Sequence, residues 1–109
     1  MSDVLQAIHA PRRREILRLV WDRERSAGDI HRALGDVTFG AVSQHLRVLE
    51  HARLVAARRE GRRRYYRAQV EVLGPLAAWL EASWSSALQR LRLRAEMEAA
   101  RRGPNPSRT

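Results

Sequence analysis

Six of the ten residues from Arg58 to Arg67 are arginines, and two tyrosines lie among them. Guanidinium groups suit paired hydrogen bonds to phosphate and to guanine. Arg62, Arg63 and Arg64 stand in a row and would repel one another unless a polyanion neutralised them. We therefore expect these three side chains to bind phosphate groups. For Arg58 and Arg59 the sequence leaves that role open.

A second polar group lies upstream, on a segment with helical spacing of its apolar residues. Ala41, Val42, Leu46 and Leu49 form the apolar side of this segment. Ser43, Gln44 and Arg47 project on the opposite side, so the pattern predicts an amphipathic helix with a polar outer face.

The composition limits the classes of partner. The chain has 109 residues, 44% of them hydrophobic, which predicts one globular domain. All 21 basic residues are arginines, and with 12 acidic residues they give a net charge of +9. Such a charge points to nucleic acid or to an anionic membrane surface. No apolar run approaches the ~18–20 residues that span a bilayer, and the start lacks the apolar region of a signal peptide. We therefore expect a soluble cytoplasmic protein. Charge alone does not choose between the two partners, and we predict nucleic acid and no membrane partner.

Several kinds of chemistry have no support in the sequence. The absence of cysteine excludes disulfides, thiolate metal sites and thiol-based redox sensing. A glycine-rich loop, a paired-carboxylate site and a cysteine nucleophile are also missing. We expect no enzymatic activity, no catalytic residue and no cofactor.

Helix signals divide the first half of the chain into four segments. Asp3 is placed to cap a short helix over residues 4–9. Pro11 suits the first turn of a second helix, which runs to about Trp21. The apolar stripe of this second helix consists of Ile16, Leu19 and Val20. Residues 22–25 read as a loop. Ser26 is a candidate N-cap for a helix to Leu34 that buries Ala27, Ile30, Ala33 and Leu34, and Gly35 ends that helix. Thr38 then caps a helix over about residues 39–52. Two helices joined by a tight turn with glycine form a helix-turn-helix layout.

The second half reads as a hairpin followed by a long helix. Residues 54–59 and 62–68 flank Glu60-Gly61, where Gly61 can adopt a positive φ. Tyr66 is expected in the core beside Val55. A helix is predicted from Pro75 to about Ala100, so residues 1–100 form the expected domain and residues 101–109 a disordered tail.

Residues 41–68, AVSQHLRVLEHARLVAARREGRRRYYRA, resemble the recognition helix and wing of the ArsR/SmtB family of winged-helix repressors. The pattern Val-Ser-x-His-Leu-x-x-Leu at 42–49, followed by Leu54-Val55 and an Arg-Glu-Gly-Arg turn at 59–62, carries the likeness. Residues 10–20 and 26–34 resemble the helices that precede the recognition helix. The resemblance implies a mainly α fold with a small β-hairpin, a winged helix-turn-helix of order α-α-α-α-β-β-α.

The resemblance also implies a function: a sequence-specific transcriptional repressor that acts as a homodimer on an inverted-repeat operator in double-stranded DNA. It implies that Ser43 and Gln44 face base edges, and both have suitable hydrogen-bonding groups. Arg47 would reach guanine or phosphate, and Thr38 with the helix-start amides suits a phosphate. His45 is either a packing residue or a further DNA contact.

The first and last helices are expected to form the dimer, since a helix of some 25 residues, ~37 Å long, exceeds what one small domain covers. The expected interface residues are Val4, Leu80, Trp84, Ala87 and Leu91. Trp79 and Trp84 are core, interface or pocket residues.

The chain departs from the family's metal-sensing members. Where those members carry a Cys-Val-Cys pair, Ser26 and Gly28 stand here, and no histidine follows His51. The tryptophan-rich segment 79–92 resembles a metal-independent branch, some of whose members are associated with a START/SRPBCC-type partner protein. We therefore expect no metal site, while an unknown effector or protein partner stays possible. Two other functions stay open: a nonspecific or architectural DNA-binding protein, and a winged-helix protein-interaction module.

Overall fold

The computed structural model describes residues 2–86, and the chain divides between Ala77 and Ala78 into two units. The first unit contains, in order, α1 (Ser2–His9), α2 (Pro11–Leu19), β1 (Arg25–Ser26), α3 (Ala27–Leu34), α4 (Phe39–His51), β2 (Val55–Glu60), β3 (Arg63–Ala68) and α5 (Val70–Leu73). Residues 75–86 are helical, as predicted from Pro75 onward. The predicted continuation of this helix to about Ala100, the domain limit at residue 100 and the tail at 101–109 lie outside the described residues.

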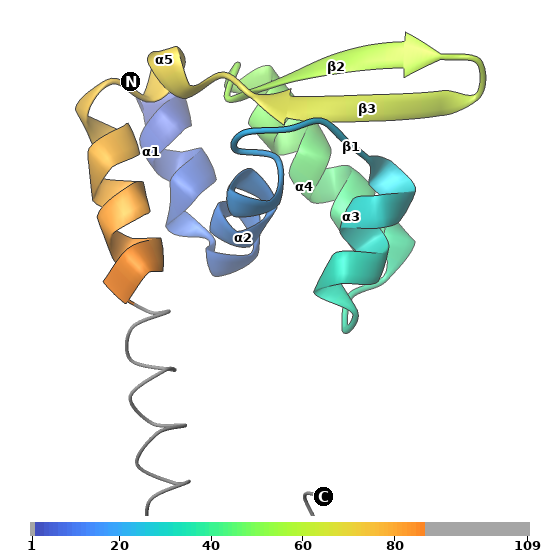
Figure 1. Ribbon diagram of the computed structural model, residues 1–109, viewed down its shortest axis with the longest axis horizontal. Helices are drawn as coiled ribbons and strands as arrows, with labels where there is room; N and C mark the ends of the chain where they lie inside the picture. Colours follow the sequence, from blue (N-terminus) through green and yellow to red (C-terminus); the bar gives the residue numbers. More distant parts are fainter. Residues whose placement is uncertain (1, 87–109) are drawn as a thin grey trace, which may run out of the picture. The chain divides into compact units, whose positions relative to one another are not determined.

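The three strands form one antiparallel sheet in the order β1-β3-β2, with β3 in the middle (Figure 1). Glu60 pairs with Arg63, so the connection is the two-residue turn Gly61-Arg62, one residue later than expected. Gly61 has a φ of +61°, which confirms the predicted positive φ. Glycine at the first turn position is typical of a type II′ hairpin, whose twist matches that of the strands.

The core of the first unit comes from α2, α3, α4 and the hairpin. Its fully or nearly fully buried side chains include Ile16, Leu17, Val20, Ile30, Val42, Leu46, Leu49, Leu54, Val55 and Tyr66. In α4 the predicted residues Val42, Leu46 and Leu49 are buried and Ala41 is half-buried, and the predicted burial of Tyr66 is confirmed. In α2, Leu17 is fully buried where the predicted Leu19 is only half-buried. Of the face predicted for α3, only Ile30 is buried, while Ala27 and Leu34 are half-buried and Ala33 is exposed.

Arginines of α2 fix the end of α1. The last four carbonyls of a helix have no partner within it. In α1 they all accept hydrogen bonds from the guanidinium groups of Arg13 and Arg14, at 2.6–3.1 Å: Gln6, Ala7, Ile8 and His9. Since α1 begins at Ser2, Asp3 lies in its first turn and is not the N-cap that we expected.

Helix α2 ends at Leu19, two residues before its predicted end at Trp21. The carbonyl of Val20 accepts from the Ala68 amide at 2.9 Å, and that of Leu19 accepts from Arg25 Nε at 2.7 Å. These long-range bonds draw the segment toward the sheet, where the two-residue strand β1 pairs with β3. Neither β1 nor the one-turn helix α5 was predicted, because elements this short have no readable periodicity.

The helix-turn-helix has the predicted caps. Ser26 Oγ accepts from the Asp29 amide at 3.1 Å, and Thr38 Oγ1 accepts from the Ala41 amide at 3.0 Å. Gly35 ends α3 with a φ of +79°. The turn is also closed by a side chain, because His31 Nε2 donates to the Val37 carbonyl at 3.0 Å. These bonds fix the start of α4 relative to α3.

Leu46 lies at the centre of the buried face of α4 and is 2% exposed. We expect Leu46→Ala to lower the free energy of unfolding by about 2–5 kcal/mol, because it removes buried methyl groups and leaves a cavity. Leu46→Met, which conserves the volume, should cost less than about 1.5 kcal/mol. Denaturant unfolding of both variants measures the difference, and equal losses would show that Leu46 does not carry the packing of α4.

Candidate nucleic-acid interface

The predicted polar face of α4 is present, and its residues border two separate hollows. Ser43 is half-buried, whereas Gln44 and Arg47 are exposed. Arg47 borders both hollows, with Ser43 on one side and Gln44 on the other. Arg47 Nη1 lies 3.5 Å from Gln44 Oε1, a long exposed contact that either residue can give up for an external partner. The outer face of α4 therefore offers both hydrogen-bond donors and acceptors.

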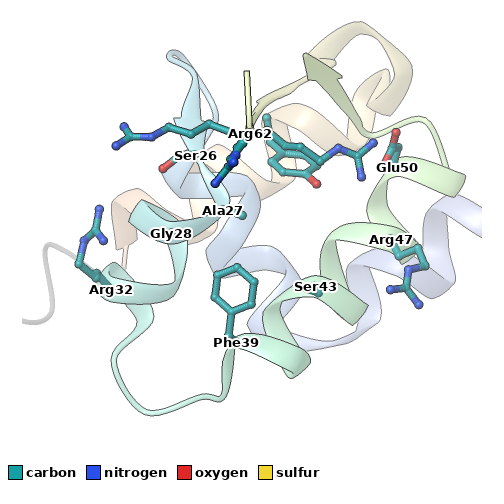
Figure 2. Close-up of a pocket in the computed structure, with 12 residues that line it drawn as sticks. Ser26, Ala27, Gly28, Arg32, Phe39, Ser43, Arg47, Glu50 and Arg62 are labelled. Atoms are coloured by element: carbon teal, nitrogen blue, oxygen red, sulfur yellow. The ribbon is translucent and has the colours of Figure 1, made fainter. Parts of the chain in front are cut away.

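The first hollow is a groove of about 460 Å³ between α3, α4 and the hairpin (Figure 2). It is lined by Ser26, Ala27, Gly28, Arg32, Phe39, Ser43, Arg47, Glu50, Arg62, Arg63, Arg64 and Tyr66. Five of these residues are arginines and one is acidic, so the groove favours an anionic occupant. Five of the residues expected to contact DNA line this groove: Ser43, Arg47, Arg62, Arg63 and Arg64.

Within residues 2–86, the side chains of Arg62, Arg63 and Arg64 are exposed and make no hydrogen bond or ion pair. Glu60 lies opposite Arg63 on the hairpin, but its carboxylate is bound to Arg58. Arg64 also pairs across the hairpin with Arg59. Like charges directly opposite on two strands destabilise a sheet. The hairpin therefore holds an arrangement that an external anion would relieve.

Arg58 lies in the same arginine-rich segment, 58–67, but unlike Arg62, Arg63 and Arg64 it has carboxylate partners within the chain. Its guanidinium donates to both carboxylate oxygens of Glu24 at 3.0 Å and to Glu60 at 2.8 Å, and it lies 4.8 Å from the centre of the Tyr65 ring. The hydrogen bonds that Arg58 donates to Glu24 and then to Glu60 raise the pKa of Arg58, and its guanidinium in turn lowers the pKa of Glu24. Arg58 thus joins the loop before β1 to the hairpin through ion pairs within the chain.

Two further residues named from the sequence have structural partners. Thr38 caps α4, so its oxygen is occupied while its hydroxyl proton stays free to donate. His45 is half-buried and accepts from Arg13 Nη1 at 3.4 Å. Burial, followed by the charges of Arg13 and Arg12, lowers the pKa of His45 and favours its neutral form. His45 joins α4 to α2 and does not line the groove.

The sequence analysis missed Phe39. This residue lines the groove with its ring turned toward the open space in Figure 2, and it is 51% exposed. A signal was available: Phe39 lies outside the apolar stripe of its helix, four and eight residues before Ser43 and Arg47. Arg32 was missed as well, but its guanidinium pairs with Asp29.

The residues expected at the dimer interface fall into two groups. Val4 and Trp84 are half-buried and Leu80 is buried in the single chain, whereas Ala87 and Leu91 lie outside the described residues. Among the described residues, Leu5 and Trp79 are large apolar side chains left exposed, at 53% and 55%. Their role in association stays a prediction.

Among residues 2–86, no group of three or more His, Cys, Asp or Glu side chains could hold a metal ion. No helix in that part of the chain is both long and apolar enough to cross a bilayer.

Comparison with known proteins agrees with this geometry. The family model of bacterial regulatory proteins of the ArsR family matches residues 10–57. The transcriptional repressor SdpR of Bacillus subtilis is 32% identical over 80 residues, which are 73% of this chain and 88% of SdpR. The HTH-type transcriptional regulator Rv2034 of Mycobacterium tuberculosis is 39% identical over 83 residues, 76% of this chain and 77% of that protein.

A solved structure shows the same fold. The homodimeric winged helix-turn-helix DNA-binding domain of a possible ArsR-family regulator from Mycobacterium bovis is similar to this chain with a TM-score of 0.66 and 34% identity, over 77% of each chain. The hairpin is therefore the wing, and α3 and α4 are the helix-turn-helix. With the relatives matched over most of their length, the chain belongs to the ArsR family of bacterial regulatory proteins and is a winged helix-turn-helix transcriptional regulator.

Proposed function

We propose that this regulator is a homodimeric repressor that binds one inverted-repeat operator and works without the metal sites of its family. The observation that carries the proposal is the groove in which three unpaired wing arginines face the polar side of α4. Such a surface combines groups that bind any phosphate with groups that distinguish bases.

The wing supplies affinity. Arg62, Arg63 and Arg64 are exposed, and within the described chain they have no acidic partner to give up when they meet DNA. Their binding to phosphates releases counterions from the duplex, a gain that salt reduces. It also relieves the repulsion between Arg59 and Arg64.

Helix α4 supplies specificity. Gln44 can form two hydrogen bonds to adenine, Ser43 can donate or accept, and Arg47 can bond guanine through two donors. Gln44 and Arg47 are exposed, so neither must break a buried contact to reach a base. Because the helix start is fixed by the Thr38 cap and by the bond from His31 to Val37, these side chains are presented from a rigid base.

Two further parts of the proposal rest on relatives and on sequence positions. SdpR is a repressor and the M. bovis domain is a homodimer, which supports steric repression by a two-fold dimer here. At the positions where the resemblance places cysteine ligands, this chain has Gly28, without a donor side chain, and Ser26, whose hydroxyl caps α3. We therefore propose that zinc, cadmium and arsenite leave DNA binding unchanged.

The salt dependence of binding tests the wing. About six phosphate contacts per dimer predict a slope near −5 for log affinity against log salt. Changing Arg62, Arg63 and Arg64 together to alanine should flatten the slope by about 1 for each lost contact and weaken all sequences similarly. Binding titrations at several salt concentrations measure this.

A matched control is the double variant of Arg18 and Arg23 to alanine, since both are exposed arginines that do not line the groove. This control variant should keep most of the wild-type slope of log affinity against log salt concentration. The wing variant should also unfold near the wild-type temperature, because the loss of the like-charged pair Arg59–Arg64 offsets the loss of the opposite-charged pair Glu60–Arg63. An unchanged slope in the wing variant would remove the wing from the mechanism.

Base selection tests α4. Gln44→Ala should relax the preference at one position in each half-site by about 1–3 kcal/mol, with a smaller effect on nonspecific affinity. Selection from random duplexes with the wild type and the variant gives the preference at every position. If both proteins select the same site with the same strength, Gln44 does not read a base. If the wild type selects nothing, the protein is a nonspecific DNA binder.

The oligomeric state of variants with a charge at an exposed apolar position tests the proposed dimer. Leu5→Glu and Trp79→Glu each place a charge on an exposed apolar position of the first and last helices, where a dimer would bury it. We expect each variant to sediment as a monomer at micromolar concentration and to lose operator affinity. Val72→Glu, at an apolar position of α5 that is 40% exposed, is the control that should stay dimeric. A monomeric wild type bound to one half-site would contradict the model.

A further inference from the structure

Phe39 is an exposed aromatic side chain at the first position of α4. It is 51% exposed, and the buried stripe of the helix, Val42, Leu46 and Leu49, does not include it. Leaving half of a phenyl ring in water costs free energy that a polar residue at this site would not. The fold therefore gains little from the exposed half of the ring.

The ring is nevertheless held in place. His31 of α3 packs edge-on against it, with ring centres 5.6 Å apart and planes at 72°. His31 is itself fixed, since its Nε2 donates to the Val37 carbonyl at 3.0 Å. A ring supported in this way loses little freedom when its exposed part meets a ligand.

Phe39 lies in the row of α4 residues that line the groove. Ser43 and Arg47 follow it at intervals of four residues, and Figure 2 shows the three side chains along one edge of the same hollow. The rest of the lining includes the three wing arginines, together with Ala27, Glu50 and the buried Tyr66. The groove thus places an exposed aromatic ring beside arginines that can bind a polyanion.

One ligand combines these two properties. In the major groove of duplex DNA, the apolar group on a base edge is the 5-methyl of thymine, and phenylalanine is among the side chains that contact it. 5-Methylcytosine presents the same group. We propose that Phe39 is a specificity-determining residue that reads the 5-methyl group of one pyrimidine in each operator half-site. This inference rests on the proposed function, because it requires α4 to enter the major groove.

Removal of single methyl groups from the operator tests the proposal. After an operator is selected from random duplexes, each thymine is replaced in turn by deoxyuridine, which keeps the pairing and loses only the methyl. For the wild type, one position in each half-site should lose about fourfold in affinity, the value for one buried methyl group. Cytosine at that position should bind weakly and regain affinity as 5-methylcytosine.

The protein side of the test uses three variants. Phe39→Ala should bind the thymine and deoxyuridine operators equally, and Phe39→Leu should keep part of the difference. Val72→Ala, which removes an exposed apolar group outside the groove lining, should keep all of it. Because the Phe39 ring is half exposed, the variants should unfold near the wild-type temperature, and thermal unfolding checks this.

The outcomes separate the two proposals. Specific binding in which neither a thymine-to-uracil change nor cytosine methylation alters the affinity, or in which these changes matter equally for Phe39→Ala, overturns the role of Phe39 and leaves the repressor model intact. A wild type without any preferred duplex sequence overturns both. A preference that appears only with a methylated library assigns the contact to 5-methylcytosine, and one found with an unmethylated library assigns it to thymine.

Discussion

Burial of the inner face of α4 is the constraint on which the candidate interface depends. Val42, Leu46 and Leu49 are inaccessible or nearly so, and α4 contacts α2, α3 and β2. A helix has one orientation that buries a given stripe, so this packing alone decides that Ser43 and Arg47 face outward. The hairpin follows α4 directly, and its own core residues, Leu54, Val55 and Tyr66, are buried in turn. The wing arginines reach the groove because both elements share one core.

Some arginines of the first unit form bonds within the fold, and others are exposed without a bond to another described residue. Arg12, Arg13, Arg14 and Arg58 are bound to carboxylates or to helix carbonyls, and they hold α1, α2 and the loop before β1 in place. Arg62, Arg63 and Arg64 have no such bonds within the described residues. The first group of arginines therefore stabilises the fold, and the second group forms a positively charged patch that can bind an anion.

Side-chain hydrogen bonds to the backbone fix the two helices of the helix-turn-helix relative to each other. A serine and a threonine cap its two helices, and a histidine of the first helix bonds to the turn between them. The same histidine supports the exposed ring of Phe39. These local bonds therefore fix the geometry of the face that we propose to read DNA.

The sequence by itself determined the elements with a local signal. Pro11, Ser26, Gly35, Thr38, Gly61 and Pro75 marked helix starts, a helix end and the turn, because caps and positive φ values depend on adjacent backbone. It also determined the family and the outer face of α4. The strand β1, the early end of α2 and the partners of each arginine came only from the tertiary structure, since they depend on residues distant in the chain.

The two arginine triplets show the difference most clearly. Residues 12–14 and 62–64 are both three consecutive arginines. The first triplet lies beside the open carbonyl end of α1 and near Asp36, so its guanidinium groups are used inside the fold. The second lies at the tip of a hairpin, where Glu60, the residue opposite Arg63, is already bound to Arg58. A side chain's partner is set by what the fold brings within hydrogen-bonding distance, and residue type alone does not carry that information.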